Sequence, residues 1–392
     1  MEHIGILGGS FNPPHIGHIR AAKHAAQALG LTRVLLVPAS QVPHKQTTAE
    51  EPSPLQRLEM TRLAVQNEPQ LEACSLEIDR GGTSYTWDTI RQLRAQYPDA
   101  AFTLLLGSDM FQCFSQWQNA DLIAQNAALA VLSRGGKHEQ EKNRAAMELL
   151  CAQGAKVTEL CNPVTEISST QVRRLLAFQC GDEFLPGNVA SYVHEQKLYD
   201  TDANWKHLPM EQLESIVVRL LNPNRVRHVL GCRDTCVALA KRWGADETDA
   251  ARAGLLHDIT KALDGPLQLT LCRAYGKILD DFSMKYPKTL HALTGSLVAQ
   301  RIFGENSRVV SAICSHTTGK ADMNVLETIV YVADYMEPNR DFPGVEQLRA
   351  LAFSDLRGAL KLGLEMTLDH LKDQGCDVSP ASKAALDYLN RS

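Results

Sequence analysis

The chain has 392 residues, more than one hydrophobic core usually serves, so two domains are expected. Its 44% hydrophobic and 22% charged residues are usual for a water-soluble globular protein, and no apolar run reaches the ~18–20 residues that cross a bilayer. The formal net charge is −5 without any long run of Lys or Arg, so general binding to nucleic acid or to a membrane surface gains no electrostatic support.

The start of the chain, MEHIGILGG, lacks the basic segment that opens a secretory signal and soon turns polar. The ten cysteines are scattered without a CxxC pair. Both features predict a cytoplasmic protein with reduced thiols and no disulfide framework.

Residues 1–200 alternate short, β-rich apolar runs with stretches of helical periodicity. The expected strands are 3–9, 33–40, 101–109, 127–134 and 155–161, and the expected helices are 16–30, 53–67 and 84–97. This alternation predicts a Rossmann-like parallel sheet with helices on both faces. Such sheets bind ligands beyond the carboxyl ends of their strands.

The sequence pattern changes after Tyr199. Residues 201–209 are mostly polar and are expected to form a linker. Strand-like alternation then disappears, and residues 210–392 are expected to form an all-α domain. Its clearest helical patterns cover residues 227–243, 246–263, 290–304, 324–336 and 358–371.

The first motif, GILGGSFNPPHIGHI, runs from a strand through a glycine turn into a helix. Gly8 and Gly9 allow backbone amides to approach a ligand closely. The helix is expected to begin near His15, so its positive end favours phosphate. His15 and His18 can project to one side of its first turn, which suits charge stabilisation on a phosphoryl group. The alternative, a plain turn with incidental histidines, is disfavoured by the surrounding glycines and Ser-Phe-Asn.

This stretch resembles the GGxF(D/N)PxHxGH signature of the HxGH nucleotidylyltransferase superfamily. Four further segments resemble, in order and spacing, the motifs of bacterial nicotinate mononucleotide adenylyltransferase. They are VPHK (42–45), TSYTWDTI (83–90), LLGSDMFQCFSQW (105–117) and EISSTQVRRLL (166–176), and the resemblance spans residues 1 to about 200.

The resemblance implies a site for ATP and nicotinate mononucleotide. Trp117 would stack on the nicotinate ring unless it is a core residue, and Thr86 lies in the segment that would recognise the pyridine carboxylate. Amides, hydroxyls and a guanidinium at 168–173 could cradle the triphosphate, although a simple capped helix explains the same residues. The implied substrate-binding residues are Gly8, Gly9, Ser10, Phe11, Thr86, Asp109, Trp117, Ser168, Ser169 and Thr170, and the implied catalytic residues are His15, His18, Lys45 and Arg173.

The implied reaction is in-line attack of the mononucleotide phosphate on the α-phosphorus of ATP, with pyrophosphate leaving. The nucleophile is already an anion, so positioning and charge stabilisation, aided by Mg²⁺, would supply most of the catalysis. Nicotinamide mononucleotide is the rival substrate, because the sequence does not place the donors around the pyridine carboxyl group.

The helical half sets ionisable side chains beside apolar residues, which is costly unless they are paired. His257 and Asp258 point about 100° apart on a regular helix, so they can share a metal centre only near a helix end, which Asp264–Gly265 could supply. Core histidines with hydrogen bonds explain single positions better than they explain the whole set. The candidate donors for one or two transition-metal ions are His228, His257, Asp258, His291, His316 and Asp334.

The segments RHVLGC, AGLLHDITK, LHALTGS, SHTTGKADM and VYVADYMEPNR resemble the HD metal-dependent phosphohydrolase superfamily. Over about 210–375 they are closer still to its YqeK subfamily of symmetrical diadenosine tetraphosphate hydrolases. The resemblance implies one metal on His228, His257, Asp258 and Asp334. Asp258 would bridge to a second metal on His291 and His316. Iron is the favoured metal, with manganese or cobalt as alternatives.

The implied reaction splits diadenosine tetraphosphate into two ADP through metal-activated water. Asp258 and Lys261 are the implied catalytic residues, and Arg340 is a candidate to hold phosphate. Lys261 could instead be a solvated lysine at a helix end. Two alternatives stay open: hydrolysis of another nucleotide, or a regulatory module that binds a nucleotide without turnover.

Overall fold

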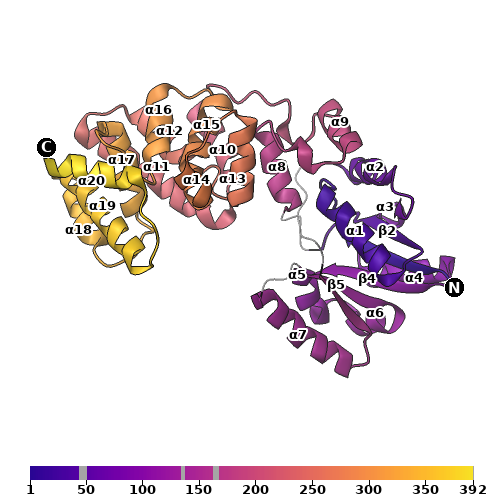
Figure 1. The fold of residues 1–392 in the computed structure, drawn as a ribbon. Helices are drawn as coiled ribbons and strands as arrows, with labels where there is room; N and C mark the ends of the chain where they lie inside the picture. Colours follow the sequence, from indigo (N-terminus) through magenta and orange to yellow (C-terminus); the bar gives the residue numbers. More distant parts are fainter. Residues whose placement is uncertain (44–50, 134–136, 162–166, 392) are drawn as a thin grey trace. The chain divides into compact units, whose positions relative to one another are not determined.

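The computed structural model of the chain describes residues 1–43, 51–133, 137–161 and 167–391. The chain divides into two compact units, Met1–Ala177 with Gly181–Asp202, and Phe178–Cys180 with Ala203–Ser392. The first unit carries a six-stranded sheet and the second is helical (Figure 1). The predicted fold class, a Rossmann-like α/β domain followed by an all-α domain, is confirmed.

The sheet of the first unit is parallel throughout, and its strand order is β3-β2-β1-β4-β5-β6. The order reverses between β1 and β4, and the crevice at such a switch point is where doubly wound sheets bind ligands. The strands are β1 (His3–Gly9), β2 (Arg33–Pro38), β3 (Leu71–Ala73), β4 (Ala101–Gly107), β5 (Ala128–Ser133) and β6 (Val157–Cys161).

Alternate residues of the central strands fill the core on one face of the sheet. Ile4 and Ile6 of β1 share one buried cluster with Ile90 and Leu93 of α4. The helices of this unit are α1 (Ile16–Leu29), α2 (Pro54–Val65), α3 (Leu76–Arg80), α4 (Thr86–Gln96), α5 (Ser108–Gln112), α6 (Ala120–Asn126), α7 (Lys137–Ala152), α8 (Ser169–Ala177) and α9 (Gly187–Glu195), with 3₁₀ turns η1 (Phe114–Gln116), η2 (Asp182–Phe184) and η3 (Leu198–Asp200).

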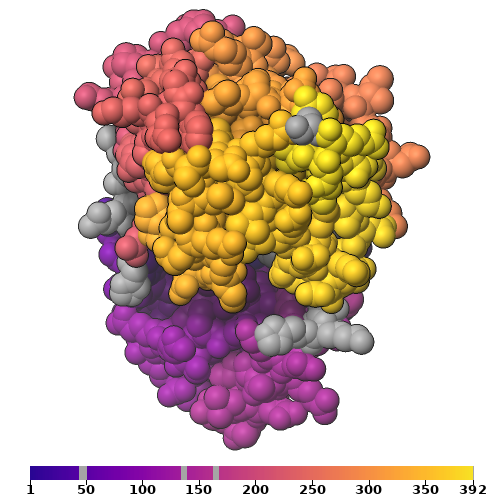
Figure 2. Space-filling model, turned by 90° about the vertical axis from the view of Figure 1, so that its left-hand side faces the viewer, coloured from indigo at the N-terminus to yellow at the C-terminus, as the bar shows by residue number. Residues whose placement is uncertain are grey.

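The helical unit is built around α11, α12, α16 and α17, which pack against one another. Its last helices, coloured yellow-orange to yellow, form a continuous part of its surface in Figure 2. The helices are α10 (Met210–Leu220), α11 (Pro223–Trp243), α12 (Glu247–Leu256), α13 (Gly265–Ala274), α14 (Asp281–Lys285), α15 (His291–Arg301), α16 (Ser307–Ser315), α17 (Val325–Met336), α18 (Val345–Ala352), α19 (Leu356–Asp373) and α20 (Pro380–Arg391), with the 3₁₀ turn η4 (Pro287–Leu290).

Several element ends differ from the sequence expectation by a few residues, and two of these differences concern the candidate sites. The strand expected over 101–109 ends at Gly107, because α5 begins at Ser108. The helix that carries the His257–Asp258 doublet ends at Leu256, well before the break expected at Asp264–Gly265, and Asp264 instead caps the next helix, α13. Among the described residues, no helix combines the length and apolarity needed to cross a membrane.

Candidate nucleotide site and candidate metal centre

The glycine turn lies at the switch point of the sheet. β1 ends at Gly9 and its neighbour β4 ends at Gly107, so both strands deliver their loops to the same edge. A Cβ added to Gly8 or Gly107 would meet no atom of the described residues within 4 Å. The backbone at both strand ends is therefore open to a closely approaching ligand.

The rings of the two histidines of the motif lie against each other at the start of α1. His15 is the N-cap, and the ring centroids of His15 and His18 lie 3.8 Å apart. The His15 backbone N–H donates to Nδ1 of His18 over 3.2 Å, so the neutral His18 ring carries its proton on Nε2. Burial lowers the pKa of His18 to about 4. His18 is therefore a neutral N–H donor at pH 7.

Helix α8 fastens the loop that follows the glycines. Ser169 Oγ donates to the Pro13 carbonyl over 2.9 Å, and Arg173 Nη1 donates to the Asn12 carbonyl over 2.6 Å. The second Arg173 nitrogen, Nη2, donates to Thr170 Oγ1 over 3.1 Å. Both residues thus shape the loop directly.

Of the three hydroxyl residues at 168–170, Ser168 caps helix α8. Ser168 Oγ accepts the Gln171 N–H, and the Gln171 side chain accepts the Ser168 N–H. This reciprocal arrangement satisfies two donors at the start of the helix.

The remaining predicted residues of this half come from separate segments. Thr86 opens α4, Asp109 is exposed in α5, and Trp117 is half-buried with its ring 5.5 Å from that of Phe114. Lys45 lies outside the described residues.

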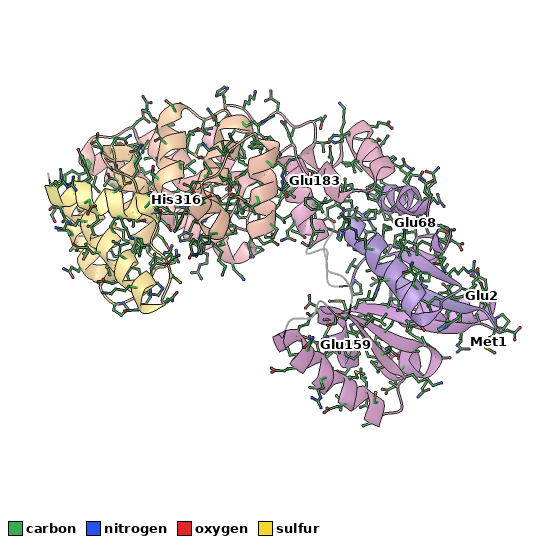
Figure 3. All side chains as sticks on the ribbon, in the orientation of Figure 1. Met1, Glu2, Glu68, Glu159, Glu183 and His316 are labelled. Atoms are coloured by element: carbon green, nitrogen blue, oxygen red, sulfur yellow. The ribbon has the colours of Figure 1, made fainter. Side chains whose placement is uncertain are left out.

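The six predicted metal ligands of the helical unit converge from five places in the chain. His228 lies on α11, the His257–Asp258 doublet directly follows α12, and Asp334 lies on α17. His291 opens α15, and the buried His316, labelled on the helical unit in Figure 3, directly follows α16. Two sets could each hold a metal ion: His228 with His257 and Asp334, and Asp258 with His257 and His316.

Asp258 occupies the middle of this cluster, and its two oxygens face different histidine pairs. Oδ2 lies 3.6 Å from Nε2 of His228 and 3.5 Å from Nε2 of His257. Oδ1 lies 3.5 Å from Nε2 of His291 and 3.8 Å from Nε2 of His316. A carboxylate placed in this way can bridge two metal ions.

Nδ1 of each of the four histidines in this cluster, the ring nitrogen that faces away from Asp258, lies near a hydrogen-bond acceptor. Nδ1 of His257, His291 and His316 lies 2.7, 3.0 and 2.7 Å from a backbone carbonyl oxygen, and Nδ1 of His228 lies 3.1 Å from Glu337 Oε1. These acceptors hold the proton on Nδ1, which leaves the Nε2 lone pairs free to bind metal. Burial lowers the pKa of His291 and of His316, which favours the neutral, ligating form.

The donor set fits a divalent transition metal. Nε2 of His228 lies 3.3 Å from Nε2 of His257 and 3.2 Å from Asp334 Oδ1. Converging lone pairs and carboxylates repel one another unless a cation lies among them, and mixed imidazole and carboxylate ligands suit iron, manganese, cobalt and zinc.

Three cationic side chains surround the cluster. Lys261 Nζ lies 2.9 Å from Nε2 of His291, and Arg340 Nη2 donates to Asp334 Oδ1 over 2.6 Å. Burial lowers the pKa of Lys261 to about 8. The guanidinium of Arg225 contacts Asp258.

Sequence reasoning missed two residues of this site. Arg225 lies three residues before His228 and so on the same side of α11, a spacing that could have indicated it. Glu337 follows the end of α17 by one residue, and its role depends on a hydrogen bond that the sequence does not display.

Comparison with known proteins agrees with this division of the chain. The Cytidylyltransferase-like family profile matches residues 6–175, and the HD domain profile matches residues 225–339. A probable nicotinate-nucleotide adenylyltransferase of Exiguobacterium sibiricum is 35% identical over 199 residues, which cover 50% of this chain and 99% of the relative. One of Gloeobacter violaceus is 39% identical over 204 residues, covering 52% and 98%.

Two solved structures are also similar. A predicted HD superfamily hydrolase involved in NAD metabolism from Clostridium acetobutylicum has 35% identity and a TM-score of 0.46, covering 47% of this chain and 99% of its own. The nicotinic acid mononucleotide adenylyltransferase of Plasmodium falciparum, complexed with NaAD, has 18% identity and a TM-score of 0.42, covering 51% and 98%.

The chain thus joins a nucleotidyltransferase domain of the cytidylyltransferase-like class to an HD domain. Within that class, the first half identifies the chain as a member of the nicotinate-nucleotide adenylyltransferase family, since relatives of that family match it over nearly their whole length.

Proposed function

We propose that the first unit transfers AMP from ATP to nicotinate mononucleotide, giving deamido-NAD and pyrophosphate. The proposal depends mainly on the placement of His15 and His18 at the start of α1, directly after the glycine turn at the switch point of the sheet. The names of the related adenylyltransferases support the choice of substrates.

In this reaction the mononucleotide phosphate attacks the α-phosphorus of ATP, and the bond to the bridging oxygen of pyrophosphate breaks. His18 donates its Nε2–H to a phosphoryl oxygen, and the amino end of α1 adds favourable potential for that charge. Arg173 holds the loop and contributes a half-buried positive charge. Mg²⁺ bound with ATP would neutralise triphosphate charge.

His18→Ala tests this proposal, with His24→Ala on the same helix as the matched control. Deamido-NAD formation from ATP and nicotinate mononucleotide should fall by about 10²–10³-fold for His18→Ala, the usual cost of losing one such donor. Unchanged turnover would contradict the proposal. The same assay with nicotinamide mononucleotide tests the acid preference, since a greater kcat/KM for the amide would reject nicotinate as the substrate.

We propose that the helical unit hydrolyses diadenosine tetraphosphate symmetrically. The support is the placement of Asp258 between two histidine pairs, with the cations Arg225, Lys261 and Arg340 around the cluster. Guanidinium and ammonium groups suit the several phosphates of such a substrate.

One water adds to a central phosphorus, the central anhydride bond breaks, and two ADP leave as the protons of the water pass to solvent. His228, His257, Asp258 and Asp334 would hold one metal, and Asp258 would bridge to a second on His291 and His316. Bound metal would supply Lewis-acid activation of the water and neutralise phosphate charge.

Asp258→Asn in the full-length chain tests this second activity, with the exposed Asp369→Asn as control. We expect ADP release from diadenosine tetraphosphate with Mn²⁺ or Fe²⁺ to disappear in Asp258→Asn, while adenylyl transfer continues. Retained hydrolysis would reject the metal-centre assignment. Tight binding without product in the unaltered chain would favour the regulatory alternative, and turnover of another nucleotide only would change the substrate.

A further inference from the structure

Arg57 of α2 is a buried cation that joins the loops after two neighbouring strands. Its side chain is 5% exposed. Nη1 donates to the Ser10 carbonyl over 2.8 Å, and Nη2 donates to the Ser40 carbonyl over 2.9 Å. Ser10 follows β1 and belongs to the glycine loop, and Ser40 follows β2. One planar guanidinium thus fixes the distance between these loops.

The connection continues from β2 to the start of α4. The Ser40 N–H donates to Ser84 Oγ over 2.9 Å, and the Ser84 N–H donates to the Gln41 carbonyl over 2.9 Å. Ser84 lies two residues before Thr86, in the segment for which the sequence predicts pyridine carboxylate recognition. The glycine loop and this segment are therefore joined through Arg57, Ser40 and Ser84.

Behind this segment, a buried carboxylate fixes the first turns of α4. Thr89 Oγ1 donates to Glu77 Oε1 over 2.6 Å. Burial raises the pKa of Glu77, while hydrogen bonds from Thr89 and Ser84 act to lower it. Ser84 is thus held between Glu77 and the backbone of residues 40 and 41, so a shift of Ser40 is transmitted to α4.

We propose that Arg57 is a positioning residue that sets the ATP-binding loop at the correct distance from the mononucleotide-binding segment. The proposal depends on the proposed adenylyl transfer, in which the two substrates occupy these two places. In-line attack requires the reacting atoms to be aligned, and a displacement of about 1 Å can cost on the order of 100-fold in rate. Lysine at this position would keep the charge but lose the planar fork that reaches both carbonyls.

Arg57→Lys and Ser84→Ala, singly and together, test the proposal in the full-length protein. Arg62→Gln, an exposed change on the same helix, is the control. We expect kcat for deamido-NAD formation to fall about 10–100-fold in Arg57→Lys and about 3–10-fold in Ser84→Ala. The Kd of each substrate measured alone by calorimetry should change less than threefold, because each half-site remains.

The double variant shows whether Arg57 and Ser84 act through the same connection or lower kcat independently. If both residues act along one connection, its kcat should match that of Arg57→Lys within about twofold. The coupling role of Arg57 would be overturned if the fold-losses in kcat of the two single variants multiply in the double variant. It would also be overturned if Arg57→Lys has the same kcat as the control Arg62→Gln. If Arg57→Lys does not fold, an unchanged kcat in Ser84→Ala still overturns it. If the unaltered chain makes no deamido-NAD, the proposed function fails and this inference falls with it.

Discussion

Glu337→Gln tests how the proposed metal centre keeps its histidines in the ligating form. Glu337 is 1% exposed, and Oε1 accepts from Nδ1 of His228 over 3.1 Å. Oε2 accepts from both the backbone N–H and the Nδ2 of Asn339, each over 2.8 Å. All three groups donate a hydrogen bond to Glu337. A carboxylate can accept all three bonds, whereas the amide of glutamine has only one accepting oxygen and cannot.

The orientation of the new amide follows from this count. With its NH₂ toward Asn339 it would lose two acceptor contacts, whereas with its NH₂ toward His228 it would lose one. The second orientation is therefore favoured, and it forces Nδ1 of His228 to accept and moves the ring proton to Nε2. That atom faces Asp258 and Asp334, so the proposed metal centre loses one ligand lone pair.

Loss of a hydrogen-bond acceptor that orients a metal-binding histidine lowers metal affinity by about 10–100-fold, which corresponds to about 1.4–2.7 kcal/mol. Mn²⁺ affinity is measured on the full-length protein by titration calorimetry with a competing chelator. Glu346→Gln is the control, because the Glu346 side chain is 81% exposed. Mn²⁺ affinities within twofold of one another in Glu337→Gln and the unaltered protein would refute the reasoning about the His228 proton.

Two further predictions concern stability. The pKa of His18 is about 4 in the folded protein and 6.5 in the unfolded chain. Between pH 6.5 and pH 4 the imidazole therefore binds a proton in the unfolded chain only. The free energy of unfolding falls as the pH is lowered through this range. His18→Asn should remove up to ~3 kcal/mol of that loss, which is measured as a weaker pH dependence of Tm. An unchanged pH dependence would contradict a neutral His18 ring in the fold. In Gly254→Ala the added Cβ would lie 2.8 Å from Arg233 Cα and 3.0 Å from Cys236 Sγ, so α11 and α12 must separate. Urea unfolding should show a loss of about 1–3 kcal/mol, and no loss would show that the pair accommodates the methyl group.

Strong periodicity made most of the sheet predictable. Five strands were expected close to where they lie, because each has a run of apolar residues long enough to show its pattern. β3 was missed, since Leu71–Ala73 has only three residues and no alternation can be recognised in it. The five-residue helix α5 was missed for the same reason, and its residues 108 and 109 were wrongly assigned to β4.

Much of the candidate site could be predicted from the chemistry of single residues. The contacts between these residues could not be predicted. A histidine next to an aspartate in an apolar run is conspicuous in the sequence, as is a pair of histidines after two glycines. Arg57 and Glu337 look like ordinary charged residues in the sequence. Arg57 acts through hydrogen bonds to two loops, and Glu337 acts through a hydrogen bond to His228, which the fold brings from another helix. Such roles become visible only when the backbone of several elements is placed.

Three histidines of the proposed metal centre share a local geometry. This geometry explains why the side chains of His257 and Asp258 can face one point. His257, His291 and His316 each directly follow the last residue of a helical segment, α12, η4 and α16. In each case Nδ1 lies at the carbonyl oxygen of the residue three positions earlier, Gly254, Lys288 and Ile313. Carbonyls in the last turn of a helix lack the usual i+4 partner, so each can accept from an imidazole, which fixes the proton of that ring on Nδ1. The Ile313 carbonyl also accepts the backbone N–H of His316. For His257 this contact accompanies the end of α12 at Leu256, which releases Asp258 from regular helical geometry and lets the adjacent side chains converge.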